Sequence, residues 1–442
     1  MKKYCPWLAI AILFLLVFFA GSAKVIAAVP GSKTVKKSVS LPQAKTSPTT
    51  PADMKSSEAN PARMTMPMPN ILQAPVLLNR NAVGCAFPLT GRFADAGNKA
   101  LDAVLLSAEI FNQRSSSPWK IIVADSGDTL AEIKEAIVYL ADVASVMAIV
   151  AISGTAEATD AAREAQKRQV PLILISSREG VTEIGEYVFQ HFLTPSQQIE
   201  ALTKYAQDAL NVAIFSVLYP QDDYGEEMVR LFRLDVQKKG GKVVRAIPYS
   251  KTQTDFTQQI EKLTGNKIGE SEKSHAAPDE GRKKGSLDFE ALFVPDSPLR
   301  VKMIASQLAY YDVKGPKLLG TSLWHSPDLL KKGAEYLEGA VFADSFLVSG
   351  FLPETNDFVD SYYSAYGRDP DNIAALSYDS MEMVLGILED RQIKTRAEFR
   401  QALLAIERFR GVTGRISFGG NRVSQKEAFI LKVQNGKIEQ VK

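Results

Sequence analysis

Residues able to contact a solute recur where the predicted strands end. Hydroxyl, aromatic and charged side chains follow six apolar runs: Phe93, Ser153 with Thr155, Ser176 with Ser177 and Arg178, Tyr224, Asp296 with Ser297, and the stretch 322–325. In open α/β sheets, ligands bind beyond the carboxyl ends of the strands, where backbone amides and helix N-termini face outward. Serine and threonine also cap helices for structural reasons alone, so one such strand end says little. Their repetition predicts a ligand-binding cleft.

Motifs for catalysis are missing from this sequence. The patterns GxxxxGK[ST], GxGxxG, HExxH, GxSxG and CxxC do not occur. The three histidines, His191, His275 and His325, are far apart and have no second histidine or cysteine nearby. Cys5 and Cys85 are the only cysteines, which excludes a disulfide framework, and Cys85 is expected to be a buried apolar residue of a strand. We therefore predict a protein that is not an enzyme and that uses no metal and no cofactor.

The elements that must position these residues alternate between strand and helix. A first series has apolar strand patterns at 81–88, 120–124, 146–152 and 170–175, separated by helical patterns at 97–111, 130–143 and 156–167. A second series has helices at 195–210, 224–239, 255–263 and 299–311 around strands at 212–218, 242–248, 291–295 and 317–319. Strands separated by helical crossovers indicate parallel sheets. The sequence therefore predicts an α/β fold with two doubly wound parallel-sheet lobes.

The last third of the chain continues with helices and ends in strands. Helical patterns cover 355–366, 372–389 and 396–408, and strand patterns cover 415–418, 428–433 and 437–441. The last two strands are separated by Asn435-Gly436, the strongest short signal for a hairpin turn. We expect them to pair as an antiparallel hairpin.

Composition and charge exclude several classes of protein. Of 442 residues, 45% are hydrophobic and 23% are charged, and 52 Lys plus Arg against 50 Asp plus Glu give a net charge of +2. These values are ordinary for globular protein and exclude collagen-like and wholly disordered chains. A nucleic-acid-binding protein usually carries a concentrated basic excess. We therefore predict no nucleic-acid partner.

The N-terminal part has the layout of an export signal. Lys2 and Lys3 precede an apolar run over 8–20, and small residues follow it, so residues 1–28 are predicted to be a cleaved signal peptide or an uncleaved signal anchor. Residues 29–79 are rich in Pro, Ser, Thr and Lys and are predicted to be a disordered linker. The patternless stretch 264–287 is interpreted as a polar insertion, either solvated or used for docking. The expected location is the periplasm or cell envelope.

Several segments carry a resemblance to a known family. VGCAFPLTGRFADAGNKALDAVLLSAEIFN, ISGTAEATDAAREAQKRQVPLILISS and YPQDDYGEEM resemble, in order and spacing, the ligand-binding turns of type I periplasmic solute-binding proteins, which include the Leu/Ile/Val-binding proteins. The segments FPLTGRF, SSREGVTEIGEYVFQHFLTP and LLGTSLWHSP look closer to the branch of penicillin-binding protein activators. The resemblance covers about residues 81–441.

The resemblance implies a hinge of three segments between the lobes. It places lobe 1 at 80–194 plus 346–419 and lobe 2 at 195–345 plus 420–442. Phe93 would cover the solute from the first lobe and Tyr224 would close over it from the second. Ser153 and Thr155 would bind a polar or anionic group, and Ser176 and Ser177 would continue that surface.

Some positions depart from the pattern of the amino-acid-binding members. Arg178 stands where those proteins have a small residue, and no second-lobe carboxylate that would hold an ammonium group is identifiable, although Asp296, beside Ser297, is a substitute.

Two classes of function follow from the resemblance. In the first, the protein captures a small polar solute and presents it to the membrane permease of an ABC importer. In the second, it regulates cell-wall synthesis by contacting a peptidoglycan synthase, and the long linker favours this alternative.

Overall fold

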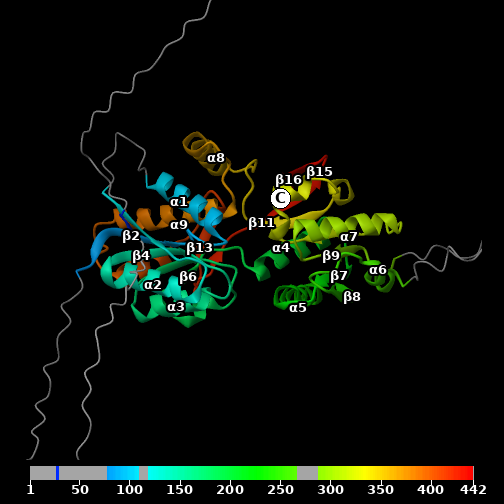
Figure 1. Cartoon of the computed structure of the whole chain (residues 1–442), viewed down its shortest axis with the longest axis horizontal. Coiled ribbons are helices and arrows are strands. Elements are labelled where there is room, and N and C mark those ends of the chain that lie inside the picture. The colour runs from blue at the N-terminus through cyan, green and yellow to red at the C-terminus, as the bar shows by residue number, and fades with distance from the viewer. Residues whose placement is uncertain (1–25, 29–76, 109–117, 266–286, 442) are drawn as a thin grey trace, which may run out of the picture.

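The protein consists of two α/β lobes lying side by side (Figure 1). The computed structural model describes residues 26–28, 77–108, 118–265 and 287–441. Most of the predicted signal segment, the predicted linker up to residue 76 and most of the polar insertion at 264–287 lie outside these residues. No helix within the described ranges has the length and apolar character required to cross a membrane.

The first lobe is built on a six-stranded parallel sheet with the order β1-β3-β2-β4-β5-β6. Its strands are β1 (Ile26–Ala28), β2 (Asn79–Phe87), β3 (Lys120–Asp125), β4 (Val146–Ile152), β5 (Leu172–Ile175) and β6 (Val188–Gln190). Its helices are α1 (Ala94–Ser107), α2 (Leu130–Val138), α3 (Ala158–Lys167), α8 (Pro353–Tyr366), α9 (Asn372–Glu389) and α10 (Arg396–Leu404). All seven residues of β4 are buried, as expected of a strand covered on both faces.

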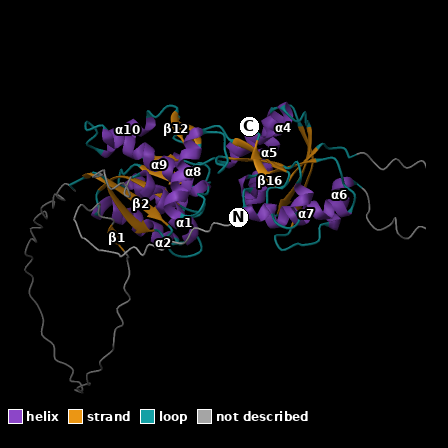
Figure 2. Ribbon diagram, turned by 90° about the horizontal axis from the view of Figure 1, so that it is seen from above, coloured by secondary structure: helices purple, strands orange, loops and turns teal. Residues whose placement is uncertain are grey.

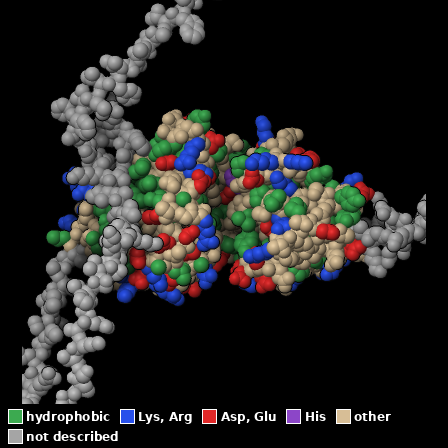
Figure 3. All heavy atoms as spheres, in the orientation of Figure 1, with side chains coloured by type: hydrophobic (Ala, Val, Ile, Leu, Met, Phe, Trp, Pro, Cys, Tyr) green, Lys and Arg blue, Asp and Glu red, His purple; other side chains and the backbone are tan. Residues whose placement is uncertain are grey.

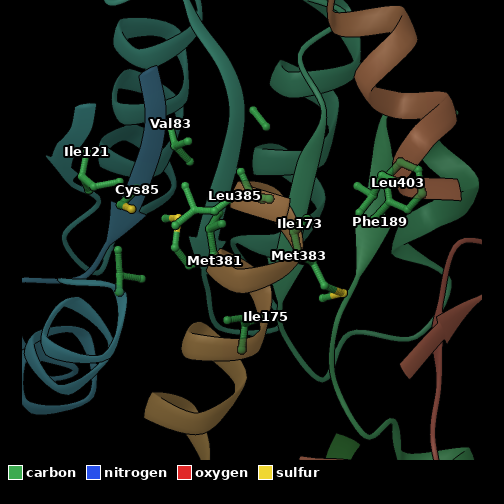
Figure 4. Close-up of a cluster of buried hydrophobic side chains, with 14 of the residues drawn as sticks. Val83, Cys85, Ile121, Ile173, Ile175, Phe189, Met381, Met383, Leu385 and Leu403 are labelled. Atoms are coloured by element: carbon green, nitrogen blue, oxygen red, sulfur yellow. The ribbon is translucent and has the colours of Figure 1, made fainter. Parts of the chain in front are cut away.

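Helices cover both faces of this sheet (Figure 2). Side chains from α1, α9 and α10 form a core with one face, and side chains from α2 and α3 form a core with the other. Figure 4 shows Met381 and Leu385 of α9 beside Cys85 of β2. Cys85 is fully buried and unpaired, as predicted, and burial raises the pKa of its thiol.

The second lobe has a seven-stranded sheet with the order β16-β15-β11-β10-β9-β7-β8. Its strands are β7 (Ile214–Pro220), β8 (Lys242–Tyr249), β9 (Ala291–Phe293), β10 (Lys317–Gly320), β11 (Val341–Asp344), β15 (Phe429–Gln434) and β16 (Lys437–Gln440). Its helices are α4 (Pro195–Asp208), α5 (Asp223–Lys238), α6 (Thr257–Thr264) and α7 (Pro298–Tyr310). The first five strands in chain order are parallel, and β15 and β16 pair antiparallel at one edge.

The chain passes between the lobes at three places. β6 leads into α4, which packs on β11; β11 leads into α8, which packs on α1; and the small sheet of β12 (Phe409–Gly411), β13 (Gly414–Phe418) and β14 (Ser424–Gln425) leads into β15. The first two passages leave from the carboxyl ends of β6 and β11. Because the parallel strands of one sheet end at the same edge, the strand ends of both lobes adjoin the passages.

The predicted fold class is confirmed: two parallel-sheet lobes follow the two predicted series of elements. The predicted hairpin is also present, with positive φ at Asn435 and Gly436. β6, β11, β12 and β14 were not predicted. β1 lies on β3 as an edge strand, in residues predicted to belong to the signal segment. A short parallel edge strand is held by backbone pairing and needs no amphipathic pattern, so the sequence offers no signal for it.

Candidate functional site

Both sheets have one point where their strand order reverses. In the first lobe β2 lies between β3 and β4, and in the second β7 lies between β8 and β9. At such a point the loops that follow two neighbouring strands leave toward opposite faces, which opens a crevice that ligands occupy. The loops concerned are 88–93 and 153–157 in the first lobe, and 221–224 and 294–297 in the second.

The crevice of the first lobe contains a cavity of about 210 Å³. Phe93 and Ser153 both line it, so the structure brings these two predicted residues together. The side-chain oxygen of Ser153 is buried and has no hydrogen-bond partner among the described residues. Leaving a buried hydroxyl without a hydrogen bond costs free energy, so a ligand that bonds to this oxygen recovers that free energy. Thr155 is exposed beside the cavity and does not line it.

Asp125 holds the loop that carries Phe93. Its carboxylate accepts hydrogen bonds from the amide of Leu89 at 2.8 Å and the hydroxyl of Thr90 at 2.6 Å. Burial opposes ionisation of Asp125, but the hydrogen bonds from Thr90, Gly127 and Leu89 outweigh it and lower the pKa of the carboxyl. The loop is therefore fixed to the end of β3.

Hydrogen bonds from the end of β6 hold the loop of Ser176, Ser177 and Arg178. The side-chain amide nitrogen of Gln190 donates to the backbone carbonyl oxygens of Ser176 at 2.7 Å and Arg178 at 2.9 Å. Ser176 is buried, Ser177 is half-buried and Arg178 is exposed. None of the three lines the cavity of the first lobe. The structure thus places this loop at the next strand end, beyond the cavity wall.

Tyr224 and Asp296 occupy the corresponding crevice of the second lobe. The hydroxyl of Tyr224 lies 3.0 Å from the hydroxyl oxygen of Thr321, and burial of that hydroxyl raises the pKa of Tyr224 to about 12, although the residue as a whole is 36% exposed. The carboxylate of Asp296 accepts from the hydroxyl of Tyr249 at 2.7 Å and from the amide of Ser297 at 2.6 Å. Both lobes therefore present an aromatic ring near the start of the helix that follows their first large strand.

A polar network joins the two lobes behind these crevices. Asp344, at the end of β11, contacts His325 of the second lobe at 2.5 Å and accepts from the amide of Asn372, at the start of α9, at 3.1 Å. Ser345 donates to the side-chain oxygen of Asn372 at 2.8 Å. Burial disfavours the charged form of His325, but Asp344 outweighs it and raises the pKa of that imidazole. The second passage is thereby tied to both lobes.

Sequence reasoning missed two carboxylates in the first lobe. Asp128 and Glu157 line the cavity with Phe93 and Ser153. Asp128 follows β3, and the small polar residues Ser126-Gly127 before it mark a strand end of the same kind as the other predicted ones. Glu157 lies at the start of α3, where an acidic residue is usually interpreted as a partner of the helix dipole.

The charges along the cleft are mixed. Figure 3 shows a furrow between the lobes with acidic and basic side chains along its edges. Arg92 lies near Asp128 and Glu157 in the first lobe, and Lys251 pairs with Asp222 at 2.9 Å in the second. Within the described part of the chain, no group of three or more His, Cys, Asp or Glu residues is arranged to hold a metal ion.

Comparisons with known proteins agree with this architecture. Residues 82–437 match the family model described as periplasmic binding protein. A comparison with curated protein sequences finds no match.

Solved structures of several other proteins have the same fold. A putative branched-chain amino acid ABC transporter from Rhodospirillum rubrum has a TM-score of 0.69 at 22% identity, with 81% of this chain and 99% of that chain covered. The substrate-binding protein LivJ from Streptococcus pneumoniae, in complex with isoleucine, has a TM-score of 0.63 at 22% identity, with 81% and 97% covered. A solute-binding protein from Rhodopseudomonas palustris, in complex with 3,4-dihydroxybenzoic acid, has a TM-score of 0.63 at 20% identity, with 81% and 95% covered.

Proposed function

The chain belongs to the periplasmic binding protein family, and on that premise we propose that it captures a small polar solute in the cleft between its lobes. The solute is bound without chemical change, the lobes close over it about the three passages, and the closed form is presented to the membrane permease of an ABC-type importer. The protein acts in the periplasm or cell envelope after export.

One observation carries this proposal. The crevice of the first lobe holds a cavity with an exposed aromatic ring, Phe93, and a buried hydroxyl without a partner, Ser153. The crevice of the second lobe holds the half-exposed ring of Tyr224 beside Asp296. A solute that touches both crevices favours the closed arrangement, because only that arrangement gives it both sets of contacts. Two of the similar structures hold small polar solutes, isoleucine and 3,4-dihydroxybenzoic acid, which supports this class of ligand.

The second candidate is a regulator of peptidoglycan synthesis that contacts a peptidoglycan synthase. It is favoured by the Pro-rich stretch at 29–79 and by the resemblance of FPLTGRF and LLGTSLWHSP to penicillin-binding protein activators. A freely diffusing carrier has no need of such a tether. Specific capture of a purified synthase, together with failure of every solute to bind, would favour this candidate.

The test is a thermal-shift screen of small solutes followed by titration calorimetry. Phe93→Ala and Tyr224→Ala are expected to weaken binding of the solute by more than about tenfold, since each removes a large aromatic face. Ser153→Ala is expected to weaken it by up to about tenfold, the value of one neutral hydrogen bond. Tyr363→Ala, on the exposed surface of α8, is the matched control and should leave affinity unchanged. Equal effects of all four variants would contradict the proposed site.

A further inference from the structure

The walls of the first-lobe cavity combine an apolar body with two carboxylates. The apolar part comes from Pro88, Phe93, Ala96, Ile133, Ile152 and Ile373. Asp128 and Glu157 line the same cavity, and their side chains are 34% and 13% exposed. Burial of this kind raises the cost of leaving a carboxylate without a cationic partner.

Both carboxylates lie close against a glycine of the backbone. Gly91 has a φ of +79°, and a Cβ atom there would lie 2.7 Å from the Oδ2 atom of Asp128. The amide of Arg92 donates to the same oxygen at 3.3 Å. A Cβ atom on Gly154 would lie 2.5 Å from the Oε2 atom of Glu157. The carboxyl group of Glu157 therefore lies against Gly154, at the strand end where Ser153 and Thr155 were predicted to bind a polar or anionic group.

The cation nearest to these carboxylates belongs to the chain itself. The guanidinium of Arg92 lies 4.7 Å from the centroid of the Phe93 ring. Its Nε atom is 3.8 Å from Asp128 and its Nη2 atom is 3.9 Å from Glu157. The side chain of Arg92 is 65% exposed. Long ion pairs of an exposed arginine contribute little, so a better-placed cation can take over both carboxylates.

From this arrangement we infer that the first-lobe cavity selects a cationic solute, an ammonium or guanidinium group on a small apolar body, and that Arg92 is a resident cation which the solute displaces. The inference rests on the proposed function and names its solute class. The ring of Phe93 favours a cation over its face. The free oxygen of Ser153 accepts one further N–H group. Asp128 and Glu157 repel an anion, because Arg92 offsets only one of their two charges.

The second lobe also offers a negative charge that suits a cationic solute. The hydrogen bonds of Asp296 come from two neutral groups, the hydroxyl of Tyr249 and the amide of Ser297. Burial, together with the neighbouring charge of Asp296, raises the pKa of Tyr249 and keeps that phenol neutral. A cation held in the first lobe would thus meet a further carboxylate when the lobes close.

Three probes of one shape test the inference: isopentylamine, isopentanol and isovalerate, titrated at pH 7 into the chain in a calorimeter. The amine should bind at least about tenfold more tightly than the carboxylate, the value of one charge-assisted hydrogen bond. Glu157→Gln should remove most of this preference. Arg92→Gln should tighten binding of the amine, because it removes the competing cation. Arg163→Gln is the control, since Arg163 is 67% exposed and pairs with Asp160 on α3, outside the cavity.

The inference is overturned if isovalerate binds as well as the amine, if Arg92→Gln weakens the amine, or if none of the three probes binds. Its failure differs from failure of the proposed function. If the solute screen returns an anion that the wild-type chain binds and Glu157→Gln does not weaken, solute capture stands and the cationic class is wrong. If no solute of any charge binds, solute capture itself fails.

Discussion

At the scale of single residues, the buried carboxylate of Asp379 joins α9 to the third passage between the lobes. It accepts from the amides of Val412 at 2.7 Å and Thr413 at 3.0 Å and from the hydroxyl of Thr413 at 2.6 Å. Lys426 donates to the same hydroxyl at 3.1 Å. Burial raises the pKa of Asp379 to about 6 and lowers the pKa of Lys426 to about 8. The two groups therefore stabilise each other's charge through Thr413.

We predict that Asp379→Ala lowers the free energy of unfolding by about 3 to 5 kcal/mol, because it leaves the ammonium of Lys426 without its neighbouring negative charge and two backbone amides without their acceptor. Urea unfolding at pH 7 measures the loss. The control is Asp328→Ala, whose carboxylate is 64% exposed and pairs with Lys331, and which should cost about 1 kcal/mol or less. Similar losses for the two variants would show that the buried network does not stabilise the fold.

The pKa of Asp125 leads to a prediction about the stability of the fold at low pH. Its folded pKa lies below the ordinary value of 3.8, so the unfolded chain binds more protons than the folded chain as the pH falls. The stabilisation is therefore present above about pH 4 and is lost as the pH falls through the lower, folded pKa. The stability difference between the wild-type chain and Asp125→Asn should be larger at pH 6 than at pH 3, measured by chemical unfolding. A difference that grows toward pH 3 would contradict this.

Single residues also show how far sequence reasoning reaches. Phe93 and Ser153 could be predicted because each directly follows an apolar strand pattern. Arg178 lies at such a place too, but the structure puts it outside the cavity wall, because which neighbouring strand ends share a cavity depends on sheet order. The contact of Arg92 with Phe93 and two carboxylates depends on side-chain directions that no sequence pattern encodes.

At the scale of elements, the helix after the first large strand of each lobe has a glycine in its first turn, packed against the end of that strand. A Cβ atom on Gly97 of α1 would lie 2.0 Å from the carbonyl oxygen of Pro88, and one on Gly225 of α5 would lie 2.0 Å from that of Pro220. These carbonyl oxygens belong to the backbone and cannot shift far enough to relieve so close a contact. These close contacts set the positions of the neighbouring rings, Phe93 and Tyr224.

We predict that Gly97→Ala lowers the free energy of unfolding by about 1 to 3 kcal/mol, the usual cost of overpacking, and weakens binding of the solute by moving Phe93. Thermal unfolding and calorimetry measure the two effects. Gly386→Ala is the matched control, since Gly386 lies within α9 and a Cβ atom there would meet nothing within 4 Å. Because alanine favours helix over glycine, this control should gain up to about 1 kcal/mol. Stabilisation by both variants would contradict the close contact.

Elements with strong patterns were predictable, and the strands that were missed are all short. β4 is an unbroken run of seven buried apolar residues, and α5 has an apolar stripe at helical spacing, so both could be predicted. β11 has only four residues and follows 3₁₀ turns, so its pattern is too short to separate from a loop. Its omission hid Asp344 and the network with His325 and Asn372.

At the scale of the whole molecule, two parallel-sheet lobes could be predicted from two repeated series of elements, whereas the order of the strands in each sheet comes from the structure. The arrangement places two crevices beside three passages. The network at Asp344 ties the second passage to both lobes, and the network at Asp379 ties the third passage to α9. Under the proposed function, we expect the solute to bind most tightly when the lobes come together over it.

Small-angle scattering of the chain, with and without a solute found in the screen, tests closure most directly. We predict that a saturating solute lowers the radius of gyration, and that the variant with both Phe93→Ala and Tyr224→Ala shows no such change at the same solute concentration. A solute that the wild-type chain binds tightly while its radius of gyration stays the same would contradict capture by closure.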